Sequence, residues 1–221
     1  MTEKEWLQCT EVDRLMNFSK DKGSCRKYRL MVIACCRRIW HLLGKKEQAV
    51  VETAENFLER KATAKELNAC SRSRLRGPAG IAVWYVCFPT NRIKSVSLNA
   101  VNTCQHAVAL DLIDRQILDV PVIDNHMGKY AVEERKHQLV LFHDIFGNPF
   151  HPIKIEHAWQ TPTIKALAQT IYTERQFADL PILADALEEA GCSNEDILGH
   201  CRNNQEHARG CWVLDILLGK K

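Results

Sequence analysis

The sequence predicts an all-α fold, a compact single-domain bundle of about ten helices over residues 1–221. Apolar residues recur at helical spacing in most segments, and no segment sustains the two-residue alternation of a half-buried strand. Pairs typical of helix N-termini precede several segments, among them Thr2 with Glu5 and Thr63 with Glu66. Helical segments that follow one another without intervening strands indicate helices packed on helices.

The helix expected after Ser24 is the centre of this fold. Its apolar positions include Met31 and Cys35, and the neighbouring residues widen this face to almost the full circumference. A helix that is apolar nearly all round is a buried one. Shorter amphipathic helices are expected over 46–60 and from Thr63.

The middle of the chain allows two interpretations. Pro78 suits the first turn of a helix, but the stretch IAVWYVCF (81–88) is also rich in β-branched and aromatic residues, so helix and strand both stay open. Ser97 is expected to begin a further helix. The stretch DVPVIDNHMG (119–128) is expected to be a connection and is the candidate boundary between two subdomains.

The second half contains the strongest helix signals. Gly147 suits the C-terminal cap of one helix, and Thr161 followed by Pro162 suits the start of another. The remaining expected helices run from Asp179 to Gly191, from Ser193 with Asp196 in its first turn, and over about 208–218.

Length and composition are those of a globular protein with 221 residues, 46% hydrophobic content and a formal net charge of +3. A domain of this length buries roughly 70% of the surface of its unfolded chain, so it needs no disulfide or metal to fold. The N-terminal stretch MTEKEWLQCT lacks the apolar region of a signal peptide. The most apolar run, LMVIACC (30–36), is far shorter than the ~20 residues of a membrane span. We therefore expect a soluble, cytoplasmic protein with no membrane partner, whose ten cysteines are reduced and mostly buried.

Four stretches carry a family resemblance: RLMVIACCRRIWHLL (29–43), DIFGNPFHP (144–152), LPILADALEEAGC (180–192) and HARGCWVLDILLGK (207–220). They resemble a family of uncharacterised bacterial proteins common in planctomycete-type genomes. The resemblance covers residues 1–60 and 139–221 and is weak between about 70 and 130. It implies an all-helical fold and brings no particular activity.

The C-terminal stretch holds a candidate zinc site in the pattern Cys192-x7-His200-Cys201-x5-His207-x3-Cys211. Structural zinc takes four Cys and His ligands. Cys192, Cys201, His207 and Cys211 are the first candidates, and His200 follows them. His200 and Cys201 are neighbours and point about 100° apart on a helix, so both can bind one ion only if the helix ends there.

Ordinary packing is the alternative for each of these residues. Cys192 follows Gly191 at the position that closes a helix C-terminal motif by apolar contact. Cys201 and Cys211 extend the apolar faces of their expected helices, and the histidines can cap helix ends. The zinc pattern also lacks the C-x2-C pairs of zinc ribbons and fingers.

Arginines form two candidate anion-binding groups, Arg37 with Arg38, and Arg72 with Arg74 and Arg76. Gathered on one face, they would neutralise phosphates of a nucleic acid. Solvated surface and pairing with acidic residues are the alternatives. A sequence pI of about 8.3 is below that of a strongly basic nucleic-acid-binding domain.

Catalytic signatures are missing from the sequence. It contains no P-loop, no G-x-G-x-x-G, no G-x-S-x-G and no H-E-x-x-H. The adjacent Cys35 and Cys36 lack the C-x-x-C spacing of redox pairs, and His143 with Asp144 is an isolated pair. An enzyme would therefore need a site that is assembled only in three dimensions.

The segment DIFGNPFHPIKIEHAW is irregular and rich in aromatic residues. Such residues either plug the core or form an interaction patch. Phe150 and Trp159 are the two whose exposure decides between these alternatives.

We expect a non-enzymatic binding or scaffold module. The sequence does not identify its partner, and another protein is the first candidate, ahead of nucleic acid. Three alternatives remain. They are a helical domain held by structural zinc as its cofactor, a nucleic-acid-binding protein that uses the arginines, and an enzyme. No cofactor other than zinc is expected.

Overall fold

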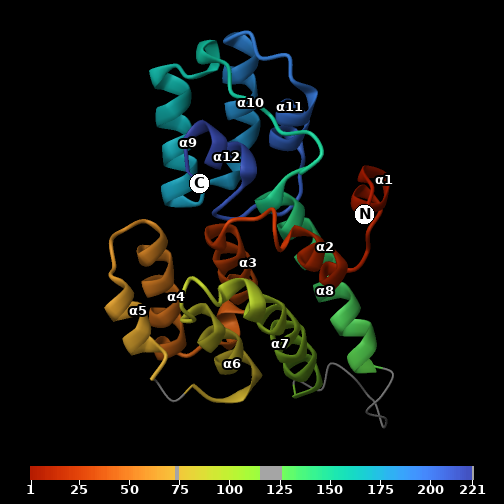
Figure 1. Cartoon of the computed structure of the whole chain (residues 1–221), viewed down its shortest axis with the longest axis vertical. Helices are drawn as coiled ribbons and strands as arrows, with labels where there is room; N and C mark the ends of the chain where they lie inside the picture. The colour runs from red at the N-terminus through yellow and green to blue at the C-terminus, as the bar shows by residue number, and fades with distance from the viewer. Residues whose placement is uncertain (73–74, 115–125, 221) are drawn as a thin grey trace. The chain divides into compact units, whose positions relative to one another are not determined.

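The computed structural model describes residues 1–72, 75–114 and 126–220, and these ranges form twelve α-helices, three short 3-10 helices and no strand (Figure 1). The predicted all-α fold is thereby confirmed. The chain divides into two compact units, Met1–Leu139 and Val140–Lys221, here called unit 1 and unit 2. The expectation of one domain stays a prediction. The boundary suggested near 119–128 lies largely outside the described residues.

Unit 1 is organised around α3. Its helices are α1 (Glu3–Leu7), α2 (Val12–Ser19), α3 (Cys25–Arg38), α4 (Lys45–Leu58), α5 (Ala64–Cys70), α6 (Gly77–Val86), α7 (Ile93–Asp114) and most of α8 (His126–Phe146), with the 3-10 turn η1 (Trp40–Leu42) after α3. Helix α3 packs against α4, α6 and α7. Met31, Val32 and Cys35 have no exposed surface, as expected for a helix that is apolar nearly all round.

Side-chain caps set the starts of three helices in unit 1, α1, α3 and α5. The Thr2–Glu5 and Thr63–Glu66 capping boxes both form, and the Ser24 side chain accepts from the backbone N–H of Lys27. Helix α7 begins at Ile93, four residues before the predicted start. The reason is that the N–H groups of residues 92 and 93 already bond to the carbonyl of residue 89, so Ser97 is buried inside the helix.

The apolar stretch at 81–88 is helical as far as Val86 and forms no strand, so the strand alternative was wrong. Pro78 lies in the first turn of α6, and Ala82, Val83 and Val86 are buried against α3 and α7. Among the described residues, no helix combines the length and the apolar character that crossing a membrane requires.

Unit 2 consists of short helices around one apolar core. Its elements after α8 are η2 (His157–Trp159), α9 (Pro162–Glu174), η3 (Phe177–Asp179), α10 (Leu180–Glu189), α11 (Glu195–Arg202) and α12 (Trp212–Leu217). Helix α10 packs against α9 and α11, and α12 packs against α9 and α11. Buried residues of all four helices form the core.

Two helix starts in unit 2 differ from the prediction. Asn194, not Ser193, caps α11, because its side chain accepts the backbone N–H of Ile197. The last helix begins at Trp212 instead of 208, since Gly210 has φ +98°, a conformation that interrupts a helix. The Arg209 guanidinium donates to two carbonyls at the end of α9 and holds this turn in place.

Candidate metal centre

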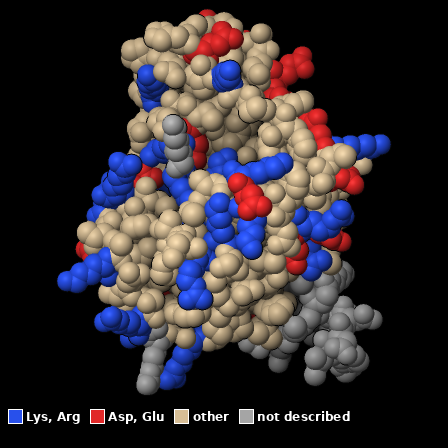
Figure 2. Space-filling model, viewed as in Figure 1, with Lys and Arg blue, Asp and Glu red and all other residues tan. Residues whose placement is uncertain are grey.

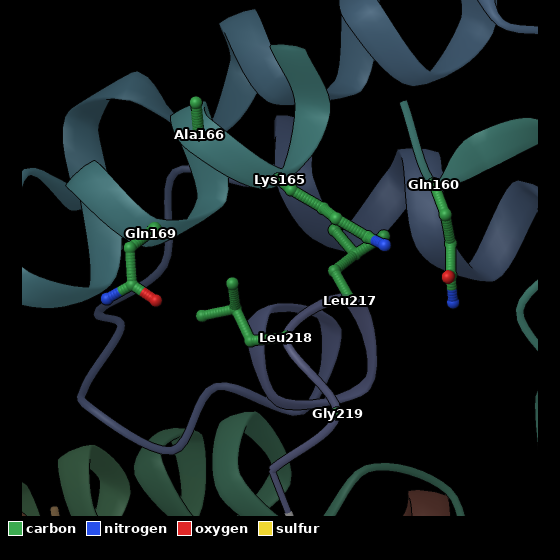
Figure 3. A pocket seen from close by; sticks show the side chains of 7 residues that line it. All are labelled: Gln160, Lys165, Ala166, Gln169, Leu217, Leu218 and Gly219. Atoms are coloured by element: carbon green, nitrogen blue, oxygen red, sulfur yellow. The ribbon is translucent and has the colours of Figure 1, made fainter. Parts of the chain in front are cut away.

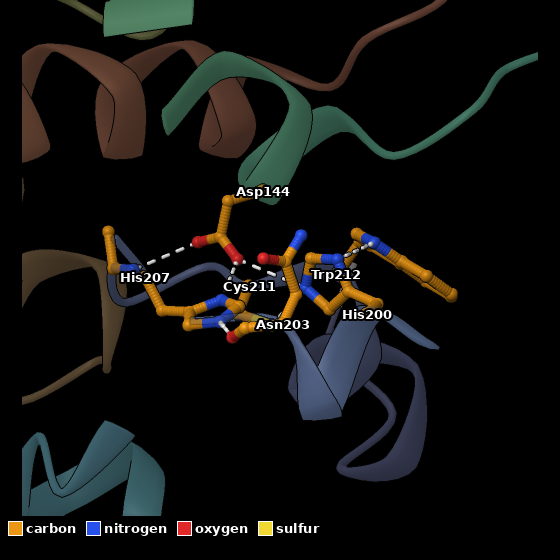
Figure 4. A network of polar contacts seen from close by, with 7 residues as sticks. Asp144, His200, Asn203, His207, Cys211 and Trp212 are labelled. Carbon is orange, nitrogen blue, oxygen red and sulfur yellow. Dashed lines mark hydrogen bonds and ion pairs between the residues drawn. The ribbon is translucent and has the colours of Figure 1, made fainter. Parts of the chain in front are cut away.

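Four polar side chains from separate parts of unit 2 converge at one point (Figure 4). Asp144 lies in the last turn of α8, His200 on α11, His207 in the loop after α11, and Cys211 immediately before α12. One potential ligand atom from each lies within 4.8 Å of all the others. Asp144 and Cys211 are buried, and the two histidines are partly exposed.

The ends of helices place these groups. Gly147, at φ +65°, accepts the left-handed conformation that terminates α8 one turn after Asp144. Helix α11 ends at Arg202. The chain after Asn203 is therefore no longer helical and turns back toward Asp144. The backbone N–H of Ala208 then donates to Asp144 Oδ2 at 2.9 Å and fixes the loop that carries His207.

Asp144 is the acceptor of this cluster. Its Oδ1 lies 2.6 Å from His207 Nδ1 and 3.1 Å from His200 Nε2. Burial alone raises the pKa of the Asp144 carboxyl, but the hydrogen bonds from the two histidines outweigh it and hold the pKa below its ordinary value. Asp144 is therefore a buried carboxylate with a donor on each oxygen.

The contact with Asp144 favours the protonated form of His207. Burial lowers its pKa, but the hydrogen bond and the charge of Asp144 outweigh burial, so the pKa of His207 lies above its ordinary value. Its Nε2 faces the carbonyl of Asn203 at 3.4 Å. A protonated imidazole satisfies both contacts, because both ring nitrogens then donate.

The hydrogen-bond network assigns the proton of His200 to Nε2. Trp212 Nε1, which can only donate, lies 3.1 Å from His200 Nδ1. Nδ1 must then be the bare nitrogen of a neutral ring. The protonated Nε2 faces Asp144 and also Cys211 Sγ, which lies 3.2 Å away.

Cys211 is a neutral thiol. It has no exposed surface. Burial first, and the nearby Asp144 charge second, raise its pKa well above the ordinary value. Because the thiolate is the reactive form of cysteine, the pair of Cys211 and His200 does not resemble an activated nucleophile.

This arrangement has the composition of a zinc site and the spacing of a hydrogen-bonded cluster. Zinc binds carboxylate O, imidazole N and thiolate S at about 2.0 to 2.3 Å, which separates two O or N ligands of a tetrahedron by about 3.4 Å. The observed contacts of 2.6 to 3.2 Å are shorter. Binding of zinc would therefore require these side chains to move apart.

The structure brings together three of the five residues predicted as zinc ligands. His200, ranked last in the sequence, is central together with His207 and Cys211. Cys192 and Cys201 lie outside the cluster and are buried in the core of unit 2. The Cys192 N–H bonds to the Leu187 carbonyl at 2.9 Å, which completes the helix-terminal motif that the packing alternative predicted.

Asp144 was missed as a ligand. It stands 56 residues before His200 in the sequence. The predicted zinc pattern contains only cysteines and histidines of the C-terminal stretch. The isolated His143–Asp144 pair next to a helix-ending Gly147 was the available signal.

The arginines predicted to bind anions lie in two different environments, some in ion pairs and others exposed. Arg37 forms a two-point ion pair with Glu55, and Arg38 forms one with Glu134. Their charges are thus largely neutralised by buried carboxylates within unit 1. Arg72 and Arg76 are exposed, and Arg74 lies outside the described residues.

The two aromatic residues predicted to form a patch do not share one environment. Trp159 is only 4% exposed and belongs to the core of unit 2, which corrects its interpretation as an interaction residue. Phe150 is half-buried, and its N–H donates to the Asn148 side chain. The segment between α8 and α9 therefore plugs the core with Trp159.

A surface hollow of about 520 Å³ lies between α9 and the end of α12 (Figure 3). Its lining consists of Gln160, Lys165, Ala166, Gln169, Leu217, Leu218 and Gly219. Lys165 is the single ionisable side chain of this lining, and it has no nucleophile or general base beside it there. The hollow thus offers no set of groups for acid–base or covalent catalysis.

No protein-family model, curated protein or solved structure matches the chain. The family resemblance of the four sequence stretches therefore stays a prediction.

Proposed function

We propose that the chain is a non-enzymatic binding protein whose unit 2 holds a zinc ion through Asp144, His200, His207 and Cys211. The observation that carries the proposal is the convergence of these four side chains within 4.8 Å. They come from α8, α11, the following loop and the start of α12, so one ion would tie together elements that are distant in the sequence. A site closed by four protein ligands is typical of structural zinc, whereas catalytic zinc keeps one position open.

Zinc fits these ligands better than magnesium or calcium does. A thiolate and two imidazoles are suited to borderline-soft cations, and hard cations prefer oxygen ligands. The burial of Asp144 and Cys211 adds to this preference, because it excludes the several waters that magnesium usually retains.

Binding of zinc has to displace protons. Cys211 must lose the thiol proton, His207 must lose the one on Nδ1, and His200 must lose the one on Nε2. The neutral ring of His200 then carries its proton on Nδ1, where the Trp212 N–H now points. The indole must therefore turn away when zinc binds. Trp212 is only partly buried, which allows this movement.

Two buried cysteines of unit 2 provide a matched test. Cys211 and Cys201 are both fully buried, and only Cys211 belongs to the cluster. Purified chain should bind about one zinc ion, and a chelator should lower its melting temperature. Cys211→Ala should abolish stoichiometric binding, while Cys201→Ala should retain it. Equal zinc content in the two variants, or no zinc in the parent chain after incubation with excess metal, would contradict the proposal.

The variant Trp212→Phe tests whether His200 is a zinc ligand. Phenylalanine keeps the ring beside His200 but removes the donor that opposes the metal-bound tautomer. Zinc affinity should rise several-fold, and indole fluorescence of the parent chain should change on titration with zinc. An unchanged affinity would show that His200 is not a ligand.

A further inference from the structure

Helix α6 of unit 1 presents an apolar face that the core does not cover. Ile81, Trp84 and Tyr85 follow one another at the i, i+3 and i+4 positions and so share one face. Phe88, two residues after the end of the helix, joins them through its ring contacts with Trp84 and Tyr85. Ile81 is 44% exposed and Trp84 is 37% exposed, while Tyr85 and Phe88 are partly exposed. We call these four residues the α6 stripe. It lies opposite the face that buries Val83 and Val86.

The three rings of the stripe hold one another in place. The centroid of Trp84 lies 4.7 Å from that of Phe88 in an edge-to-face contact, and Tyr85 stacks on Phe88 with an interplanar angle of 27°. The indole N–H of Trp84 also donates to the carbonyl of Ser71 at 3.1 Å. These contacts fix the orientation of rings that remain accessible to solvent.

Positive charge is concentrated around this stripe. Between residues 60 and 94 the sequence has eight Lys and Arg residues and one acidic residue, Glu66. One of these cations, Arg92, lies next to a ring of the stripe. The Arg92 guanidinium stands 5.8 Å from the centre of the Phe88 ring, and Arg72 directly follows Ser71, the partner of Trp84. Figure 2 shows Lys and Arg side chains over α5 and α6 with few acidic residues among them.

A basic hollow lies at the end of the stripe. It has a volume of about 400 Å³, and Thr90, two residues after Phe88, forms part of its wall. Three arginines also line it, namely Arg26, Arg29 and Arg60. Arg26 is 4.0 Å from Glu59, whereas the side chain of Arg60 is exposed. Arg29 donates to the carbonyl of Phe88 and so links this hollow to the backbone at the end of the stripe, while Arg60 provides the exposed cation.

We propose that the α6 stripe and the neighbouring arginines form a binding surface for single-stranded nucleic acid. Bases stack on accessible aromatic rings, and cations along the same path attract the phosphates, which is how sequence-tolerant single-strand binders work. A duplex hides the faces of its bases, so it can use only the charges. The proposal is independent of the zinc centre, because all of these residues belong to unit 1.

The charge distribution along the chain supports a polyanionic partner for unit 1 in particular. Residues 1–139 contain 23 Lys and Arg against 16 Asp and Glu, a net charge of +7, whereas residues 140–221 contain 7 against 11, a net charge of −4. The overall value of +3 conceals this contrast. The pI of the whole chain is therefore a poor guide to the partner of one unit.

The test measures binding of the full chain to fluorescently labelled oligonucleotides of about 20 nucleotides, as single strands and as a duplex. Single strands should bind with a micromolar Kd near 50 mM salt, and affinity should fall steeply as salt rises. The duplex should bind at least about five-fold more weakly, since it offers no stacking. Addition of a chelator should leave these values unchanged.

Variants separate stacking from charge. Trp84→Leu keeps an apolar side chain in the helix but removes the ring, and it should weaken single-strand binding by about five-fold or more. Trp84→Phe should retain most of the affinity. Arg72→Gln together with Arg92→Gln should weaken binding and reduce the salt dependence. Lys154→Gln together with Lys165→Gln in unit 2 removes the same number of charges and should have no effect.

Three results would overturn the proposal. They are no binding at low salt, equal affinity of the parent chain and a folded Trp84→Leu variant, and equal affinity for single strand and duplex. Binding to vesicles of anionic lipid that depends on Trp84, without binding to oligonucleotides, would assign the surface to a membrane instead. Circular dichroism of each variant establishes that it is folded.

Discussion

Gly147 is the residue on which the geometry of Asp144 most directly depends. Its φ of +65° ends α8, and a Cβ at this position would lie 3.1 Å from Cγ of Trp212. Gly191 has a comparable φ of +87°, but a Cβ there would meet no atom within 4 Å. The two glycines thus share a backbone requirement and differ in their side-chain surroundings.

Replacing each glycine by alanine separates these two effects. Gly191→Ala should lower the free energy of unfolding by about 1 kcal/mol, the cost of the left-handed conformation. Gly147→Ala should lower it by more, about 2 to 3 kcal/mol, since Trp212 must also move. Denaturant unfolding measures both values, and equal losses would contradict the tight contact with Trp212.

Cys87 predicts a pH dependence of stability. Burial raises the pKa of its thiol to about 12. In the unfolded chain the thiol loses its proton from about pH 8.5 upward, but in the folded chain it keeps the proton until about pH 12. The folded state therefore binds more protons in this window, and its stability falls as pH rises.

The comparison with Cys87→Ala isolates this contribution. Between about pH 9 and 11, the parent chain should lose up to about 1.4 kcal/mol per pH unit relative to the variant. Other groups that titrate in this range are common to both proteins and cancel in the difference. Parallel pH profiles would show that the thiol ionises freely in the folded chain.

Arg29 connects two elements, α3 and α6. Its guanidinium is only 1% exposed and donates to the carbonyls of Val86 and Phe88 at the end of α6. A cation at the C-terminus of a helix satisfies carbonyls that have no partner in the helix and interacts favourably with the helix dipole. Burial lowers the pKa of Arg29 to about 10, so the side chain stays charged at neutral pH.

Loss of this contact should be costly. Arg29→Met leaves the carbonyls of Val86 and Phe88 without this donor, and the free energy of unfolding should fall by about 2 to 5 kcal/mol. Arg26→Met, one turn earlier on α3, removes a long ion pair with Glu59 and should cost less than about 1 kcal/mol. Similar losses in the two variants would contradict the capping role.

The sequence predicts the start of a helix well where a single capping residue determines it. Thr63, Ser24 and Thr161 each cap the helix that they were expected to cap, because a hydroxyl group next to the first turn acts locally. The turn before α12 was assigned to the helix, since its interruption depends on Gly210 and on contacts of Arg209 with α9. Such contacts leave no periodic pattern in the sequence.

The candidate metal centre is predictable only in part for a related reason. His200, His207 and Cys211 lie within twelve residues, so their types and spacing are visible in the sequence. Asp144 joins them only because α8 ends beside the loop that carries His207. Cys192 and Cys201 have the right chemistry, but tertiary packing directs them into the core instead.

The whole molecule combines a basic unit and an acidic unit in one chain. The proposed nucleic-acid surface belongs to the unit of charge +7, and the proposed zinc centre belongs to the unit of charge −4. Negative charge around a cation site favours the bound cation, and positive charge around a phosphate-binding surface favours the strand. The net charge of each unit is thus opposite in sign to the charge of its proposed ligand.

Seven of the ten thiols are buried, four in unit 1 and three in unit 2. A thiol-labelling reagent reaches a buried sulfur only during an opening event, so the rate of its modification measures how often that part of the chain opens. Cys9, Cys25 and Cys70 are partly exposed, so we expect them to react faster and to provide the internal standard. The modification rates of the natural buried cysteines therefore report how often each unit opens, and no cysteine has to be introduced.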